Sequence, residues 1–360
     1  MFCQVEPEQV VAVHNVSSTY HVPLLLEKQG LVKTIRNILM LDDIPKAKSL
    51  GDRGQRTWTE WKNLTSQQDR LFDTVSIVLV GKYTNLHDSY LSVIKSLEHS
   101  AMRCGKKLNL VWVDASNLEE QARTDDPAAF HKAWHEVCTA NGILVPGGFG
   151  QRGTEGMIAA AKWARTNKTP YLGICLGMQI AVIEFARNVC GITGASSVEL
   201  NEQCSDPLVI FMPEIDKTNL GGTMRLGLRP TLFQPGSEWS RLRQLYGEKV
   251  EIHERHRHRY EVNPDYIDQL AQAGLNFIGK DDKGVRMEII ELKDHPWYVG
   301  VQFHPEYLSR VLDPSKPYLG FVAAAAGCLE KVTEDMGKSG TLTNGNAEAS
   351  LVNGLNGVRI

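Results

Sequence analysis

The 360-residue sequence has no apolar leader and no long apolar run. Its first residues, MFCQVEPEQ, include acidic side chains where a signal peptide would be apolar, and no uninterrupted apolar stretch could cross a bilayer. The net charge is only -3, which gives no general attraction to nucleic acids or to acidic membranes. These absences predict a cytoplasmic protein whose partners are small molecules or proteins, with neither nucleic acid nor membrane among them.

The seven cysteines lack the paired spacing of a disulfide framework and contain no C-x-x-C zinc motif. Their odd number and their scatter from Cys3 to Cys328 favour a reducing compartment. Hydrophobic residues make up 42% of the chain and charged residues 22%, as in ordinary globular proteins. One large domain or two smaller ones are therefore expected.

Four segments can be distinguished along the chain. Residues 1–41 contain an apolar run and a helical pattern but are too short to form a core, which predicts the end of another domain. Residues 42–73 are charged and polar, typical of an interdomain linker or an exposed helical connection. Residues 74–329 alternate strand-like and helix-like patterns. Residues 330–360 end in a stretch rich in Gly, Asn, Ser and Thr, which predicts a disordered tail.

Residues 74–329 predict an α/β fold. The strand-like segments SIVLVG, LNLVWV and GILVP alternate with helical patterns, which is typical of a central, mostly parallel sheet flanked by helices. The later segments VRMEIIEL and WYVGVQF are short strands joined by loops. They predict additional antiparallel strands beside the parallel ones.

Cys175 lies in GICLG, between an apolar strand and a helix-forming segment. This is the cysteine counterpart of the G-x-S-x-G nucleophile elbow, in which small residues on both sides allow a sharp turn. The N-terminus of the following helix would favour the thiolate over the thiol. A cysteine in an apolar segment can equally be a buried core residue, so this motif alone leaves both interpretations open.

His304 ends a second strand, in WYVGVQFHPE. Pro305 biases it towards extended backbone, and Glu306 could hold the imidazole in one tautomer. On its own H-x-E is a weak motif, and such a histidine can be an ordinary surface residue. Together with the elbow, however, the segment supplies a nucleophile, a base and an orienting carboxylate: Cys175, His304 and Glu306.

The glycine-rich loop in ILVPGGFGQRGTEG has more than one interpretation. GFGQRG follows a strand and precedes a helix, as in the dinucleotide-binding fingerprint of a nicotinamide-dependent oxidoreductase. That fingerprint needs an acidic residue after the next strand, where this sequence has Cys175. We prefer an oxyanion hole formed by the backbone N–H groups of Gly148 and Leu176. A plain tight turn stays open for Gly150 and Gly153.

The segment ERHRHRYEVN alternates arginines with histidines: Arg255, His256, Arg257, His258 and Arg259. In a strand the two residue types would lie on opposite faces. The histidines suggest a metal site, but no third ligand follows at a metal-binding spacing, and we predict no metal. Such a run is usually a solvated face, although one arginine could bind a substrate carboxylate. Arg225, in GGTMRLG, could similarly contact an anion or a nucleotide.

Five motifs together, PGGFG, LGICLGMQ, GGTMRLG, ERHRHRYEVN and QFHPE, resemble in wording and order the glutaminase domain of CTP synthases. FCQVEPEQ, SSTYHVPLLLEKQG and VGKY also resemble the end of that family's synthase domain, its linker and its first glutaminase strand. The resemblance covers residues 1 to about 325. It implies a class I glutamine amidotransferase fold that hydrolyses L-glutamine to glutamate and ammonia, and in the whole enzyme the ammonia converts UTP to CTP with ATP.

The resemblance also implies roles for individual residues. It makes Cys175 the nucleophile, His304 the base and Glu306 its partner. The oxyanion donors are Gly148 and Leu176, and bound glutamine is surrounded by Gly148, Leu176, Gly177, Met178, Gln179, Glu199 and Arg259. Phe149 and Arg225 match positions associated with activation by GTP. No cofactor is implied for the glutaminase, whereas ATP, UTP, Mg²⁺ and the effector GTP act in the full-length family.

The sequence departs from the family in two respects. ASSVEL stands where the family commonly has Asn-Ser-Thr-Glu, so Ser196 and Val198 change the polar groups beside Glu199. The chain also begins near the end of the synthase domain, and we expect it to lack amidoligase activity. An alternative function is a truncated interaction or regulatory form that co-assembles with full-length CTP synthase, a family of homo-oligomers that form tetramers or filaments.

Overall fold

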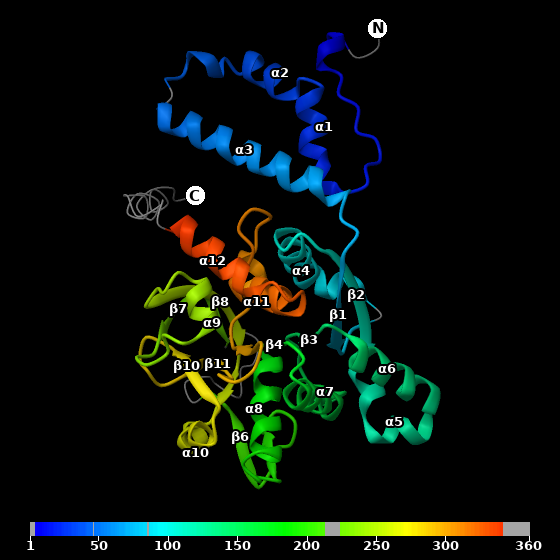
Figure 1. Ribbon diagram of the computed structural model, residues 1–360, viewed down its shortest axis with the longest axis vertical. Helices are drawn as coiled ribbons and strands as arrows, with labels where there is room; N and C mark the ends of the chain where they lie inside the picture. Colours follow the sequence, from blue (N-terminus) through cyan, green and yellow to red (C-terminus); the bar gives the residue numbers. More distant parts are fainter. Residues whose placement is uncertain (1–3, 46, 85, 213–223, 341–360) are drawn as a thin grey trace. The chain divides into compact units, whose positions relative to one another are not determined.

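A computed structural model describes residues 4–45, 47–84, 86–212 and 224–340 (Figure 1). The chain divides into two compact units, residues 1–73 and 74–360. The second unit begins at Thr74, the first residue of strand β1 (Thr74–Gly81).

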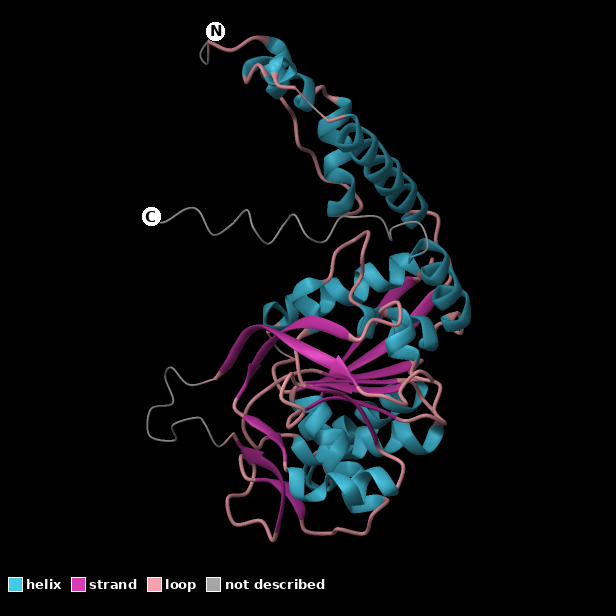
Figure 2. Cartoon of the chain, turned by 90° about the vertical axis from the view of Figure 1, so that its left-hand side faces the viewer, coloured by secondary structure: helices cyan, strands magenta, loops and turns pink. Residues whose placement is uncertain are grey.

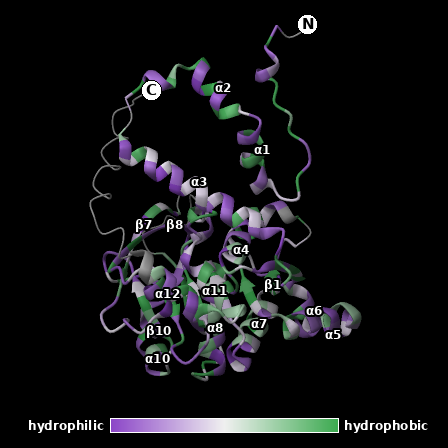
Figure 3. Cartoon of the chain, turned by 45° about the horizontal axis from the view of Figure 1, so that its top comes forward, coloured by the Kyte–Doolittle hydropathy of each residue, from purple (hydrophilic) through white to green (hydrophobic). Residues whose placement is uncertain are grey.

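The first unit is helical. It contains α1 (Val22–Lys28), α2 (Leu31–Ile38), α3 (Lys48–Gln68) and the short 3-10 segments Pro7–Gln9, Thr19–His21 and Leu41–Asp43. Polar residues recur along α3, which is coloured largely purple and white in Figure 3. Trp61 donates its indole N–H to the Tyr20 carbonyl at 3.1 Å, and a ring nitrogen of His21 lies 3.0 Å from the Thr65 carbonyl. The charged segment 42–73 is therefore mostly one helix, tied to the residues just before α1.

The second unit is built on a nine-stranded sheet among the described residues, with the order β2-β1-β3-β4-β12-β11-β10-β7-β8. The parallel half consists of β1, β2 (Lys107–Asp114), β3 (Gly142–Val145), β4 (Tyr171–Ile174) and β12 (Tyr298–Val301). The antiparallel half adds β11 (Met287–Glu291), β10 (Asn276–Lys280), β7 (Arg225–Phe233) and β8 (Glu251–His258). Ile174 pairs with Val301, the last residues of β4 and β12, so the C-terminal ends of these two neighbouring strands lie side by side.

Helices cover both faces of this sheet (Figure 2). Ile77 and Leu79 on β1 pack with α4 (Leu91–Arg103), α9 (Arg241–Leu245), α11 (Lys316–Ala325) and α12 (Leu329–Gly340). Val78 and Val80 face the opposite core, with α6 (Pro127–Thr139), α7 (Thr154–Asn167) and α8 (Leu176–Asn188). Because β1 is buried on both faces, its sequence is a continuous apolar run rather than an alternating one.

The remaining elements lie around this core. A small second sheet contains β5 (Ala195–Ser197), β6 (Asp206–Phe211) and β9 (Tyr260–Val262), and two short helices are α5 (Glu120–Asp125) and α10 (Ile267–Gln272). The predicted α/β architecture, a mostly parallel central sheet with added antiparallel strands, is confirmed. No helix in the described ranges is long and apolar enough to span a membrane.

Helix α12 corrects the predicted start of the tail, because residues 330–340 are helical rather than disordered. Leu329 and Val332 are buried against the core that contains α4 and α11, and Met336 packs onto the same cluster. Their spacing of three and four residues puts them on one face of a helix, and burial of that face stabilises it. Residues 341–360 of the predicted tail, and residues 221–223 of the GGTMRLG motif, lie outside the described residues.

Candidate active site

Cys175 occupies a strained turn between β4 and α8. Its φ is 52° and its ψ is -101°, a conformation that a residue with a Cβ rarely adopts. A Cβ on Gly173 would lie 2.4 Å from the Gly177 carbonyl oxygen, and a Cβ on Gly177 would lie 2.1 Å from the Val145 carbonyl oxygen. The elbow predicted from GICLG is present, and both glycines are needed because the backbone approaches them too closely for any side chain.

His304 and Glu306 stand opposite this turn, just after β12. The Nδ1 atom of His304 lies 2.8 Å from Oε1 of Glu306, and both side chains are largely buried. The backbone N–H of His304 donates to the Arg255 carbonyl at 2.7 Å, which fixes the residue against β8. Burial opposes a charge on His304, but the Glu306 carboxylate and a hydrogen bond with Cys175 outweigh it and raise the pKa of His304 well above its usual value.

Gln302 is a site residue that the sequence analysis missed. Its side-chain Nε2 donates towards the Cys175 sulfur at 3.6 Å, and its Oε1 accepts from Nε2 of Gln179 at 3.1 Å. Gln302 precedes His304 by two residues, and in extended backbone such residues share a face. This two-residue spacing is the sequence signal that could have identified Gln302.

The predicted oxyanion loop lies beside the elbow. A Cβ on Gly147 would meet the His304 ring at 2.8 Å, and a Cβ on Gly148 would lie 3.5 Å from the Leu176 side chain. Gly150 and Gly153 have φ values of 80° and 74°, so they fit the tight-turn interpretation, which requires glycine. The loop therefore brings backbone next to both Cys175 and His304.

Lys82, which the sequence analysis also missed, holds this loop from the end of β1. Its ammonium donates to the Phe149 carbonyl at 3.3 Å and to the carbonyl of Gly150. On the same loop the Gly150 N–H donates to the Glu199 carboxylate at 3.0 Å. Burial lowers the pKa of Lys82 to about 8, although Glu199 opposes that shift. Nothing near VGKY in the sequence reveals this contact, because the loop lies more than sixty residues further along the chain.

A cleft of about 360 Å³ opens onto these groups, within the range of small-molecule sites. It is lined by Cys175, His304 and Glu306, by the loop residues Pro146 to Phe149, and by Tyr83, Ser89, Tyr90, Ser92, Val93, Arg257 and Tyr307. A cysteine thiol, an imidazole with its carboxylate, and a glycine loop thus meet in one cavity. This set can transfer an acyl group to the cysteine sulfur.

Four of the residues predicted to bind glutamine lie outside the elbow and the glycine loop: Glu199, Arg259, Met178 and Gln179. Glu199 and Arg259 both lie within electrostatic reach of Tyr260: burial raises the pKa of Tyr260, Glu199 adds to the increase, and Arg259 opposes it. The side chain of Met178 is fully buried in the core with α8, and the Gln179 amide bonds to Gln302 and to the Tyr260 carbonyl. Met178 could therefore meet a ligand only through its backbone.

The two positions predicted for an effector nucleotide have different surroundings. Phe149 is 43% exposed and lines the cleft. Arg225 is not among the lining residues, because its guanidinium lies 3.1 Å from the Glu288 carboxylate and 3.9 Å from that of Asp281. The structure does not bring Phe149 and Arg225 together in this cleft.

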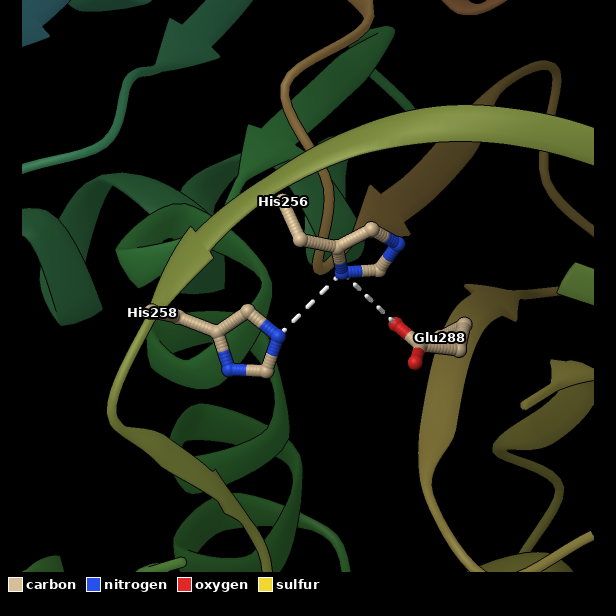
Figure 4. A group of neighbouring side chains, drawn as sticks. All are labelled: His256, His258 and Glu288. Carbon is tan, nitrogen blue, oxygen red and sulfur yellow. Dashed lines mark hydrogen bonds and ion pairs between the residues drawn. The ribbon is translucent and has the colours of Figure 1, made fainter. Parts of the chain in front are cut away.

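Strand β8 alternates as predicted, with Arg255 and Arg257 exposed and with His256 and His258 buried. The argument that no third metal ligand is near is wrong, because Glu288 on β11 approaches the pair (Figure 4). The Nδ1 atom of His256 lies 3.2 Å from Nε2 of His258 and 3.6 Å from the Glu288 carboxylate.

The neighbouring Arg225 guanidinium argues against a metal ion at this cluster. Burial lowers the pKa of His256 to about 2 and that of His258 to about 3, which keeps both imidazoles neutral and by itself would permit a metal. Burial also raises the pKa of Glu288 to about 8, with Arg225 opposing that shift. The guanidinium of Arg225 already faces the Glu288 carboxylate, and a dication there would add positive charge to a buried site. We interpret the cluster as a hydrogen-bonded support of β8, and the absence of a metal stays a prediction.

Comparison with known proteins gives consistent matches. The family model "Glutamine amidotransferase class-I" matches residues 85–324. A CTP synthase of Schizosaccharomyces pombe is 64% identical over 92% of this chain, and one of Neurospora crassa is 61% identical over 95% of it. The chain spans 55% and 59% of the length of these two relatives.

A solved structure is also similar to this chain. The glutaminase domain of Trypanosoma brucei CTPS with bound acivicin is 38% identical and superposes with a TM-score of 0.64. The match covers 71% of this chain and 94% of that domain.

Proposed function

This chain belongs to the class I glutamine amidotransferases, and within them to the CTP synthases, and from that membership we propose that it hydrolyses L-glutamine through Cys175. The proposal is carried by one observation: Cys175 on its strained elbow shares a cleft with the hydrogen-bonded pair of His304 and Glu306. The glycine loop at Gly148 adds support, because backbone N–H groups beside a nucleophile can bind the developing oxyanion.

The proposed reaction has two steps. The thiolate of Cys175 attacks the side-chain amide carbon of glutamine, and the N–H groups of Gly148 and Leu176 bind the resulting oxyanion. The Nδ1 atom of His304 is engaged by Glu306, so Nε2 gives its proton to the departing ammonia. His304 then takes a proton from water, the hydroxide attacks the thioester, and glutamate leaves as the thiolate is restored. Glutamine and water become glutamate and ammonia, with no cofactor.

We further propose that Arg259 binds the α-carboxylate of glutamine and Glu199 its α-ammonium. Support comes from Tyr260. Burial raises the pKa of its hydroxyl, Glu199 adds to the increase and Arg259 opposes it, so both charges lie near this ring. Two opposite charges at one place can bind the ammonium and the carboxylate of one amino acid. The Gly150 N–H donates a hydrogen bond to the Glu199 carboxylate, which connects the proposed ammonium-binding residue to the oxyanion loop. Gly148, Leu176, Gly177, Met178 and Gln179 complete the proposed glutamine site.

We propose roles for nucleotides only in a full-length enzyme. The relatives are named CTP synthases, so ATP, UTP and Mg²⁺ are proposed to act in a complete enzyme of that length. Phe149 keeps its proposed contact with the effector GTP because it is exposed at the cleft, whereas Arg225 would first have to leave Glu288. The oligomers and the cytoplasmic location stay predictions.

Assay of the purified 360-residue chain tests the proposed function. We expect glutamate and ammonia from glutamine, and no CTP when UTP, ATP, Mg²⁺ and free ammonia are supplied. Residues 1–73 contain no glycine-rich strand-to-helix turn that could bind phosphates, and ammonia bypasses the glutaminase. Chromatography measures the nucleotides and a coupled assay measures glutamate. A preparation that releases no glutamate would refute the glutaminase proposal, and CTP formation would refute its second part.

A further inference from the structure

We propose that Gln302 is a further catalytic residue, whose side-chain N–H stabilises the Cys175 thiolate, and that Gln179 and the Tyr260 carbonyl fix its direction. This inference rests on the proposed function only in taking Cys175 as the nucleophile. The geometry that carries it is a chain of amide hydrogen bonds. Gln302 contacts the sulfur at 3.6 Å, Gln179 contacts Gln302 at 3.1 Å, and the Tyr260 carbonyl contacts Gln179 at 3.2 Å.

The orientation of both amides follows from the last link. A backbone carbonyl can only accept, so the atom of Gln179 that faces the Tyr260 oxygen must be the NH₂ group. The same NH₂ group reaches Gln302, which must then present its oxygen to Gln179. The remaining end of the Gln302 amide, its NH₂ group, therefore faces the sulfur of Cys175. One fixed acceptor thus aims a donor at the nucleophile.

Burial makes this relay rigid. Gln302 is 1% exposed and Gln179 is 3% exposed, so little water competes for their hydrogen bonds. The Gln302 backbone N–H donates to the Glu288 carbonyl at 2.9 Å, which holds the residue against β11. A donor that is already in place and shielded from water stabilises a thiolate more than a thiol, because the anion is the better acceptor.

The sulfur then has two polar neighbours with different tasks. The charged groups that line the cleft around it are His304, Glu306 and Arg257. His304 exchanges a proton during the reaction, so its charge changes between steps. The Gln302 amide stays neutral and keeps its N–H throughout, and it can stabilise the sulfur anion whenever the thioester breaks. Tyr260 directly follows Arg259, so the relay also joins the proposed carboxylate-binding residue to the nucleophile.

The test is the pH dependence of Cys175 alkylation by iodoacetamide, read by peptide mass spectrometry. Gln302→Leu removes the donor, and we expect the midpoint of the pH–rate curve to move up by about one pH unit. Gln302→Glu keeps the shape of the side chain and puts a carboxylate beside the sulfur, so it should move the midpoint further up. Gln179→Leu frees the Gln302 amide to turn, and a smaller upward shift is expected.

Gln269→Leu is the matched control, because Gln269 is an exposed glutamine on α10 and should leave the curve unchanged. Thermal unfolding establishes that each variant is folded. Gln302→Leu and Gln302→Glu curves that coincide with that of the unmodified chain would overturn the proposal. Iodoacetamide does not require a glutamine site, so a chain that alkylates as expected but releases no glutamate would refute the proposed function and not the relay.

Discussion

Cys175→Ala is expected to abolish glutamine hydrolysis while leaving the fold intact. Alanine lacks the sulfur that attacks the amide, and the residues that line the cleft include no second cysteine, so activity should fall on the order of 10³-fold or more. Alanine keeps the same Cβ as cysteine at φ 52°, so the strained turn gains no new clash. Release of glutamate measures the loss, and circular dichroism with a thermal melt measures the fold.

Cys328→Ala is the matched control for this variant. A hydrogen bond with Cys104 lowers the pKa of the Cys328 thiol, burial opposes this shift, and Lys106 and Lys331 assist it, so Cys328 is a second thiol to compare with Cys175. It lies between α11 and α12, outside the residues that line the cleft. If Cys328→Ala lost activity and Cys175→Ala kept it, the assignment of the nucleophile would be wrong.

Arg259→Lys is expected to raise the KM for glutamine about 10- to 100-fold, with a smaller effect on kcat. The guanidinium can make two parallel hydrogen bonds to a carboxylate, whereas an ammonium group makes one, and each bond to a charged group is worth about one to two factors of ten in affinity. Steady-state kinetics with glutamine gives the two constants. The same variant should react with iodoacetamide at an unchanged rate, because that reagent has no carboxylate to bind.

Arg229→Lys is the control for this substitution, since Arg229 is exposed on β7 and should keep the original KM. If Arg259 had only a structural role, the Arg259→Lys variant would lose alkylation by iodoacetamide and glutamine turnover together, and its melting temperature would drop.

The sequence was sufficient where function depends on short segments. GICLG dictates a strained elbow, because a Cβ on either of its glycines would lie only 2.4 or 2.1 Å from a backbone oxygen. His304 and Glu306 are two residues apart, and a short 3-10 turn that begins at Pro305 brings Nδ1 of His304 to 2.8 Å from Oε1 of Glu306. The strands around them were predictable for the same reason: each is a continuous apolar run, as expected for a sheet that is buried on both faces.

The contacts that the sequence did not predict join distant segments. Lys82 reaches the loop at Phe149, Glu288 approaches His256 from another strand, and Gln302 connects Cys175 to Gln179. None of these pairs has a local spacing that marks it, because strand order in a mixed sheet decides which side chains meet. The start of the tail was predicted too early for another reason: the Gly- and Ser-containing sequence after Met336 outweighed the three apolar residues that anchor α12.

Mass spectrometry of the chain after reaction with a diazoketone analogue of glutamine tests the central claim most directly. The analogue carries the α-amino acid group of the substrate and a carbon that alkylates a thiolate, so it needs both the glutamine site and the nucleophile. We predict one added label, on the peptide that contains Cys175, and protection by excess glutamine. Labelling of Cys328 or of several cysteines while Cys175 stays unmodified would contradict the account. Labelling that excess glutamine does not reduce would contradict it as well.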